Sequence, residues 1–343
     1  MIRYVGNIEY SEERIKIGLL TLHSWGNIIY FGNLKSETSS SSKSNEIIIL
    51  NADWLSKMMS CLTKSKLQGG ILKSNESNLI WIDKTLYPLD IHSSILLILE
   101  KFDLIVELER RKENNNNNKN NVQEEEIIIY LVPCILSNEK PQEKMQILWK
   151  QEHLKESWNR IYQFSHQIPL GLFHMLMVKI LKISFSKIDE EREYWKNGMI
   201  LFSSQESLCI LIEMDEERKK IIISCLISKI EYQQQRDKYF LQIIEEMESI
   251  LQEKYSQQLP VKIFISCKCD ECLNGSNPHL FPFSEKDCNY EQQGQSLETL
   301  KQLNLNPTCD HSFTEISLSD LLPQSKKILE YFIFHNLNIF PYI

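Results

Sequence analysis

Residues 158–183 read WNRIYQFSHQIPLGLFHMLMVKILKI, and they decide how this chain is organised. Large apolar side chains recur at Trp158, Tyr162 and Phe164, with the alternation that is typical of a strand. Pro169 suits the first turn of a helix, and an almost wholly apolar run follows it. We therefore predict a strand that leads into a mostly buried helix, at the point where one packed unit ends and another begins.

The bulk composition allows two domains and argues against nucleic acid as a partner. The chain has 343 residues, of which 42% are hydrophobic, and this is enough to build ordinary cores. The net charge is −8, and nearly all of the excess acid lies beyond residue 150. A surface that follows phosphates needs clustered lysine and arginine, so we expect no nucleic-acid partner.

The start of the chain and the use of cysteine indicate a cytoplasmic protein. The first residues, MIRYVGNIEYSEER, have no long apolar core behind a basic flank, and no window is long enough to span a bilayer. Nine cysteines in so long a chain are not typical of a disulfide framework. We expect no transmembrane segment.

Residues 1–157 are interpreted as a winged-helix-like, mainly helical half. Apolar residues at helical spacing predict a helix over 53–64, which either Asn51 or Asp53 would cap. A second helix is predicted over 90–102, after a proline.

A β-hairpin is predicted to follow these helices as the wing. Strands over 104–108 and 127–132 flank charged and asparagine residues, which predicts a long, Asn-rich wing loop over 109–126. A winged-helix reader of nucleic acid needs Arg, Lys, Asn or Ser on its recognition helix, and the two helices offer little beyond Lys57 and Lys64. Nucleic-acid binding stays open as the least favoured function.

Residues 158–343 are interpreted as an antiparallel sheet with covering helices, so the fold class is α+β. After a turn over 190–198, the pattern predicts a meander of three strands, a long amphipathic helix and a further strand, over residues 199–202, 207–214, 220–228, 236–255 and 261–266. A cysteine-rich insert occupies 267–311. The aromatic segment 325–340 is predicted to dock on its own domain or on another chain.

The insert contains the one pattern in the chain that suits a metal. Cys267, Cys269 and Cys272 form a C-x-C-x-x-C cluster, and Cys309 and His311 form a later C-x-H pair. Thiolates and an imidazole at these spacings can close a tetrahedral site around Zn²⁺, which would order an otherwise polar loop. We therefore name these five residues as candidate ligands of a structural zinc ion.

The insert has other interpretations as well. Cys288 and His279 could also serve as ligands, whereas the simplest alternative is free cysteines in a poorly ordered loop of a reducing cytosol.

Catalysis is not expected of these residues. The stretch GGILKS at 69–74 lacks the spacing of a phosphate-binding loop, and no kinase catalytic loop, nucleophile elbow or dinucleotide fingerprint is present. We expect neither catalytic nor cofactor-binding residues, and we expect this chain not to be an enzyme by itself.

Six blocks of sequence carry a family resemblance. They are LHSWGNIIYF (22–31), LNADWLSKMMSCL (50–62), LLILEKFDLIVEL (96–108), YLVPCIL (130–136), IYQFSHQIPLGLF (161–173) and YWKNGMIL (194–201). In this order they resemble the COR domain, which follows the Ras-like Roc GTPase domain in Roco proteins such as the leucine-rich-repeat kinases.

The resemblance implies a two-part module within a larger GTPase, and within a kinase in some members. Its N-terminal half would pack on the Roc domain, and its C-terminal half would form a homodimer. The resemblance places the contact with the GTPase domain around Tyr162, with Phe164 and His166 beside it. GTP or GDP would bind only through a Roc domain that these residues do not contain, so we expect an excised part of a longer chain.

Three functional hypotheses result. The leading one is a regulatory and dimerisation module that couples a GTPase domain to its partner subunit. The second is a zinc-stabilised adaptor for protein interactions, and the third is a winged-helix binder of nucleic acid. Under the leading hypothesis, some of the aromatic surface around Tyr162 should be exposed here, because the GTPase domain that covers it is missing.

Overall fold

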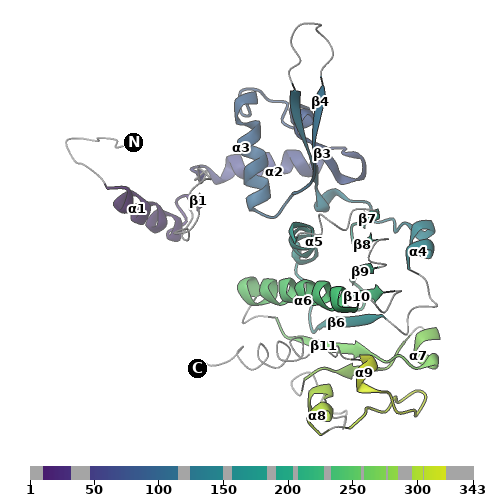
Figure 1. The fold of residues 1–343 in the computed structure, drawn as a ribbon. Coiled ribbons are helices and arrows are strands. Elements are labelled where there is room, and N and C mark those ends of the chain that lie inside the picture. Colours follow the sequence, from purple (N-terminus) through teal and green to yellow (C-terminus); the bar gives the residue numbers. More distant parts are fainter. Residues whose placement is uncertain are drawn as a thin grey trace. The chain divides into compact units, whose positions relative to one another are not determined.

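The protein is described here by a computed structural model (Figure 1). It describes residues 11–31, 47–114, 124–149, 157–183, 191–203, 208–227, 233–255, 259–275, 277–284, 296–303 and 305–321. The chain divides into two compact units, the first formed by residues 1–102 and 109–130 and the second by residues 103–108 and 131–343. Helices and antiparallel strands occur in the same chain, so the α+β class is confirmed.

Among the described residues, the first unit contains three helices and several short 3₁₀ turns. They are α1 (Glu12–Ser24), α2 (Ala52–Lys64) and α3 (His92–Lys101), with short 3₁₀ turns at Gln68–Gly70, Ser74–Leu79 and Leu89–Ile91. Asn51 caps α2, because its side chain accepts a hydrogen bond from the Trp54 N–H at 3.0 Å. The buried face of α2 is formed by Leu55, Met58 and Leu62.

Two small sheets accompany these helices. Strand β1 (Ile29–Phe31) pairs antiparallel with β2 (Ile47–Ile49), and β3 (Ile71–Lys73), β5 (Glu124–Leu131) and β4 (Val106–Asn114) form a sheet in the order β3-β5-β4. A winged-helix arrangement of the N-terminal half stays a prediction.

The predicted wing loop over 109–126 is wrong at both ends. Strand β4 continues through Asn114 and β5 begins at Glu124, so only 115–123 fall outside the described residues. Backbone pairing does not require apolar side chains, and both faces of a projecting hairpin can carry solvated charges. Arg110 and Glu126, for example, form an ion pair at 3.5 Å between the two strands.

The second unit is built on one seven-stranded sheet. Its strand order is β12-β11-β6-β10-β9-β8-β7, and the neighbouring strands pair antiparallel. The bounds are β6 (Trp158–Phe164), β7 (Glu191–Trp195), β8 (Gly198–Ser203), β9 (Leu208–Asp215), β10 (Lys220–Ile227), β11 (Val261–Ser266) and β12 (Leu280–Pro282). The predicted meander and the strand over 261–266 are confirmed.

The interpretation of 190–198 as a turn is wrong, because residues 191–195 form the edge strand β7. Polar residues fill most of this strand, and only Trp195 is fully buried. An edge strand can carry such a pattern because only one of its sides is paired.

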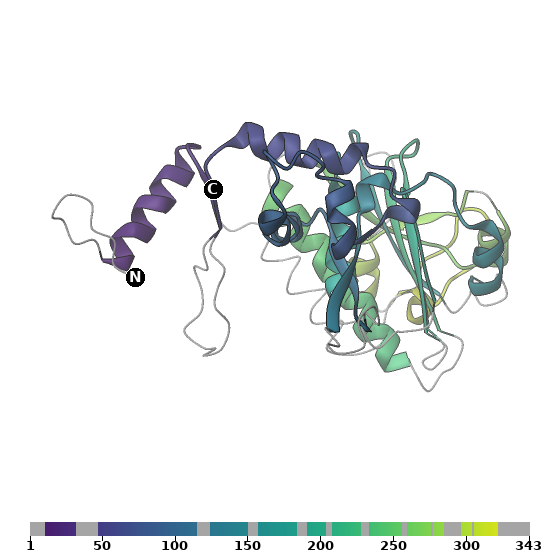
Figure 2. The same cartoon turned by 90° about the horizontal axis from the view of Figure 1, so that it is seen from above.

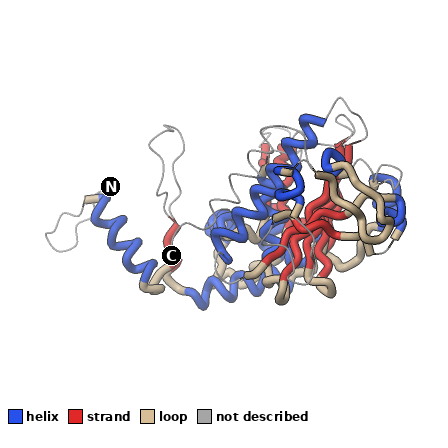
Figure 3. Tube along the Cα trace, turned by 90° about the horizontal axis from the view of Figure 1, so that it is seen from below, coloured by secondary structure: helices blue, strands red, loops and turns tan. Residues whose placement is uncertain are grey.

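Helices cover both faces of this sheet. Helices α5 (Leu172–Lys182) and α6 (Gln233–Tyr255) pack against each other, and α6 packs on β10 (Figure 2). Figure 3 shows the helices and strands of this unit as separate layers. Helix α4 (Gln142–Leu148) contributes Met145 and Leu148 to a cluster with side chains of β7, β8, β9 and β10.

The remaining helical segments are short. They are a 3₁₀ turn at Pro133–Ile135, α7 (Asp270–Asn274), α8 (Leu297–Gln302) and α9 (Leu318–Leu321). Among the described residues, no helix combines the length and the apolar character that crossing a membrane requires. The predicted docking segment 325–340 lies outside the described residues.

Candidate functional site: the four-thiol cluster and the β6–α5 junction

Three of the candidate metal ligands lie on a tight turn directly after β11. Cys267 follows the last residue of the strand, and Cys269 is the N-cap of α7. The Cys269 N–H donates to the Cys267 Sγ at 3.4 Å, and the Cys272 N–H donates to the Cys269 Sγ at 3.4 Å. The backbone thus folds around the sulfur atoms, which brings the three thiols to one side of the turn.

A second turn, far along the chain, supplies the fourth thiol. The Cys309 N–H donates to the Thr314 carbonyl at 2.9 Å, and the Phe313 N–H donates back to the Cys309 carbonyl at 2.8 Å. Thr308 and Glu315 form an isolated antiparallel bridge that closes this turn. Cys309 is consequently held by its own short hairpin.

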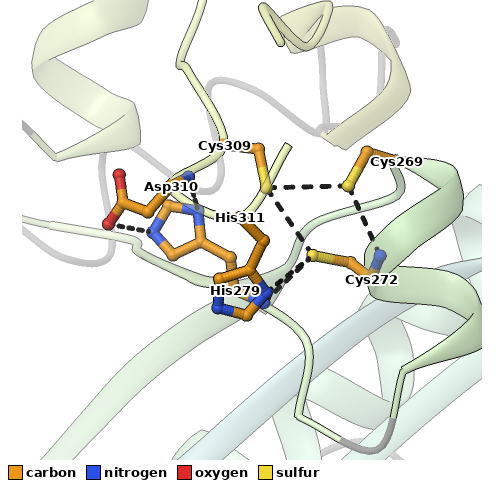
Figure 4. A network of polar contacts seen from close by, with 6 residues as sticks. All are labelled: Cys269, Cys272, His279, Cys309, Asp310 and His311. Carbon is orange, nitrogen blue, oxygen red and sulfur yellow. Dashed lines mark hydrogen bonds and ion pairs between the residues drawn. The ribbon is translucent and has the colours of Figure 1, made fainter. Parts of the chain in front are cut away.

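The two turns bring four sulfur atoms together, as Figure 4 shows for three of them. The Sγ atom of Cys309 lies 3.6 Å from that of Cys269 and 3.6 Å from that of Cys272. The Sγ atoms of Cys267, Cys269, Cys272 and Cys309 all lie within 4.8 Å of one another, and these cysteines are free thiols. A cluster of this kind could hold a metal ion.

The two histidines of the insert lie at the border of the cluster. His311 places its Nδ1 at 3.5 Å from the Cys272 Sγ. His279 contacts Asp310 through both ring nitrogens, since Nδ1 accepts from the Asp310 N–H at 3.3 Å and Nε2 lies 3.2 Å from the Asp310 carboxylate. The backbone N–H of His279 also donates a hydrogen bond to the Cys272 Sγ at 3.2 Å.

The environment acts differently on the individual thiols. Burial raises the pKa of Cys267, and it raises the pKa of Cys272 to about 11. Burial also raises the pKa of Cys309, but hydrogen bonds from Ser312 and from the backbone at His311 outweigh it and lower this pKa to about 5.

The cluster lies inside a small hydrophobic core. Cys267, Cys272 and Cys309 are buried, and Cys269 is half-buried. Apolar side chains from β11, β12, α8 and the C-terminal turns share this core, among them Ile265, Phe281, Phe283, Leu297, Ile316 and Leu321. The other predicted candidate, Cys288, lies outside the described residues.

The second candidate site, at the junction of β6 and α5, differs from expectation. Tyr162 is 0% exposed and Phe164 is 1% exposed, so the predicted exposure of aromatic surface around Tyr162 is wrong. Both side chains alternate onto the inner face of the sheet, where the described chain itself covers them. Among the three predicted interface residues, only His166 is exposed.

Tyr162 lies in a buried polar environment. Its hydroxyl has no hydrogen-bond partner of good geometry among the described residues. Burial and the nearby carboxylate of Glu248 raise the pKa of Tyr162 well above its ordinary value, although Arg160 opposes them.

Sequence reasoning missed two residues near this junction. Leu170 is 99% exposed in the turn between β6 and α5, next to Gly171, which adopts a left-handed conformation with φ of 84°. Arg160 is 2% exposed, and its Nη1 lies 3.1 Å from the Glu248 Oε1 on α6. The Pro-Leu-Gly sequence is a turn signal that could have indicated Leu170, and strand alternation could have placed Arg160 inside.

The relatives found by sequence are very large proteins of Dictyostelium discoideum. The chain is 27% identical over 270 residues to the probable serine/threonine-protein kinase pats1, which covers 78% of this chain and 7% of that protein. It is 25% identical over 313 residues to cyclic GMP-binding protein C, which covers 83% of this chain and 11% of that protein. The chain therefore spans only a small part of these relatives.

Two family models divide almost the whole chain between them. Residues 5–136 match the model described as "C-terminal of Roc, COR-A domain", and residues 155–324 match the "C-terminal of Roc, COR-B domain". The match to the kinase relatives falls on their COR region. The chain therefore belongs to the COR family of Roco proteins and carries a COR-A domain followed by a COR-B domain.

Proposed function

We propose that this chain is the regulatory and dimerisation module of a Roco-type GTPase. It would pack on the Roc GTPase domain of its own protein and couple that domain to a second subunit. The proposal rests on one observation, that a COR-A domain is followed by a COR-B domain in one chain. Both domains are named for their position C-terminal to Roc. Guanine nucleotide would act on the module only through Roc.

The exposed end of the β6–α5 junction is the surface that we assign to the Roc contact. His166 is exposed, and Leu170 leaves an apolar side chain almost fully in water. Tyr162 and Phe164 would support this surface from within, since neither can reach a partner in this conformation. Burial of a leucine that is exposed in isolation would contribute about 1.5–3 kcal/mol to the association.

Co-purification with the Roc domain tests this assignment. We expect Leu170→Asp, alone or with His166→Asp, to weaken the association at least tenfold without changing the melting temperature of the module. Leu303→Asp is the matched control, because Leu303 is also exposed but lies at the end of α8. Equal affinity of the wild type and Leu170→Asp would contradict the assigned surface.

Tyr162→Ala is unsuitable for the same experiment. Removal of a fully buried aromatic ring costs about 3–5 kcal/mol of stability, so a lost association would only report unfolding.

Dimerisation through the COR-B half is tested separately. Sedimentation equilibrium of residues 1–343 should show a concentration-dependent dimer, and a strict monomer at high concentration would show that this half is not sufficient. The two tests are independent, so the Roc contact can stand if dimerisation fails.

A second candidate function is favoured by the four-thiol cluster. We propose that the cluster holds a structural zinc ion, which would make COR-B a metal-stabilised interaction module. The four thiols, three of them buried, already lie close together, which supports this candidate, and it is compatible with the first. Zinc analysis of the purified chain tests it.

A further inference from the structure

We infer that the zinc ion has an all-thiolate shell of Cys267, Cys269, Cys272 and Cys309, which excludes His311, and that it clamps the cysteine-rich insert onto the COR-B sheet. This inference rests on the second candidate function, that the cluster holds a metal. It assigns the ligands and the role of the ion, which the sequence pattern leaves open.

The distances between the sulfur atoms suit a tetrahedral ion. A Zn–S bond is about 2.3 Å long, so two sulfurs of a regular tetrahedron lie roughly 3.8 Å apart. Two of the pairs are already at 3.6 Å, and no pair exceeds 4.8 Å. Shifts of less than about 1 Å would complete the shell, and these distances are far too long for disulfides.

The contacts of the histidines argue against imidazole ligands. Both ring nitrogens of His279 face Asp310, so neither is directed at the sulfur atoms. The Nδ1 of His311 lies 3.5 Å from the Cys272 Sγ, a separation that suits a hydrogen bond to the thiolate as well as a shared ion. Among the described residues, however, the ligand atoms that all lie within 4.8 Å of one another are the four sulfurs, without a nitrogen of His311. We therefore assign His311 as a hydrogen-bond donor to the Cys272 thiolate and not as a ligand of the ion.

Backbone amides around the cluster suit a site that carries negative charge. Zn²⁺ with four thiolates has a net charge of −2, and N–H groups that point at the sulfurs offset this charge. Cys267, Cys269 and Cys272 each accept one such hydrogen bond, from the amides of Cys269, Cys272 and His279. Four protein ligands leave no open position, so the ion is structural.

The clamp joins parts of the chain that are distant in sequence. Cys267 continues directly from β11, whereas Cys309 lies beyond α8, and the ion would connect the two ends of the insert. The same core contains Phe283, whose ring lies 4.2 Å from the guanidinium of Arg160 on β6. Loss of the ion would loosen the cover over strand β6 of the sheet.

Metal content and the cobalt spectrum test the ligand set. We expect the intact chain, purified without chelators, to contain one zinc per molecule. Replacement by Co²⁺ should give tetrahedral d–d bands together with charge-transfer absorption of four Co–S bonds. A chain without stoichiometric zinc that also fails to bind added Zn²⁺ or Co²⁺ would overturn both the metal candidate and this inference, while the Roc proposal would be untouched.

Substitutions distinguish a ligand set of four thiolates from one that includes a histidine. His311→Gln and His279→Gln should retain one zinc and the same charge-transfer intensity per cobalt. Cys272→Ser and Cys309→Ser should lose most of the metal, whereas the control Cys134→Ser should retain it. Loss of zinc or of the four-thiolate spectrum in a folded His311→Gln variant would overturn the assigned ligands and leave the metal candidate standing.

Limited proteolysis tests the clamp and avoids variants that fail to fold. Chelation of the wild-type chain should accelerate cleavage within 267–321 at least tenfold, and added Zn²⁺ should restore protection. Cleavage within 52–102, which belongs to the other unit, should be unchanged and serves as the internal control. Equal protection of 267–321 with and without metal would contradict the clamp.

Discussion

Arg160 is a charged residue on the inner face of β6, whose other residues, Trp158, Tyr162 and Phe164, are buried and aromatic. Its side chain is almost inaccessible, its guanidinium lies over the ring of Phe283, and it forms an ion pair with Glu248 of α6. Removing a guanidinium from water is costly unless a carboxylate and further contacts compensate for it. This ion pair therefore specifies which part of α6 packs over β6.

Removal of the carboxylate should be more damaging than removal of the whole pair. We expect Glu248→Ala to lower the free energy of unfolding by about 3 kcal/mol, because the charge of Arg160 stays buried. Arg160→Met with Glu248→Met should cost less, and the control Glu253→Ala, which removes a mostly exposed carboxylate, should cost less than about 1 kcal/mol. Urea denaturation measures these differences, and a double variant less stable than Glu248→Ala would contradict the argument.

His174 on α5 should make stability depend on pH. Burial, assisted by the charge of Lys196, lowers the pKa of His174 in the folded protein. The unfolded chain therefore takes up a proton first as the pH falls below about 6.5, and the folded state loses stability towards acid pH, with no effect at higher pH.

The His174→Gln variant isolates this contribution. Between about pH 6.5 and pH 5 its free energy of unfolding should fall less steeply than that of the wild type, by at most about 1.4 kcal/mol per pH unit. Denaturant titrations at several pH values measure both slopes. Parallel curves for the two proteins would show that His174 has the same pKa in both states.

At the scale of elements, the β7–β8 hairpin depends on the close approach of one glycine to one tryptophan. Trp195 and Gly198 are paired across the hairpin, with two residues between them. A Cβ atom at position 198 would lie 2.0 Å from the Cζ2 of Trp195, whose ring is buried in the cluster that α4 covers. The indole thus occupies the space that any larger residue would need.

Gly198→Ala should therefore cost about 3 kcal/mol of stability, because the indole has to move out of a packed cluster. Gly18→Ala is the control, since a Cβ there meets nothing within 4 Å and alanine favours the helix α1. Thermal denaturation of both variants, followed by tryptophan fluorescence, measures the effect. A Gly198→Ala protein as stable as the wild type would mean that the hairpin relaxes freely.

At the scale of the molecule, the packed units do not coincide with the family boundaries. The COR-B model begins at residue 155, but α4 lies before it and belongs to the second unit. Met145 and Leu148 of α4 are buried against Trp195, Ile200 and Leu211. Lys140 adds an ion pair to Glu213 at 2.6 Å. The sheet therefore needs residues outside the matched domain.

A COR-B protein that starts at residue 155 should consequently be less stable than one that starts at residue 131. We expect a difference of about 3 kcal/mol, since two large apolar side chains and their binding surface lose their burial. Chemical denaturation of residues 131–324 and 155–324 compares them, and Met145→Ala in the longer protein should reproduce part of the loss. Equal stability of the two would show that α4 contributes nothing.

The sequence by itself determined the features that depend on near neighbours. Local periodicity and local hydrogen bonds produce the strand at 158–164, the helix that follows Pro169, the meander and the cap of α2, which the sequence placed at Asn51 or Asp53. The residue types of the metal cluster were also visible, because thiol chemistry is a property of the side chain. Any fold that buries the same side chains of these strands and helices would contain the same elements.

Only the tertiary structure decided which side chains meet and which are covered. Four thiols from two distant turns converge, Tyr162 and Phe164 are buried, and the polar strand β7 joins the sheet as its edge. Each outcome depends on contacts between residues far apart in sequence, and local patterns carry no information on such contacts. The free energy that selects them comes from burial and pairing in the completed fold.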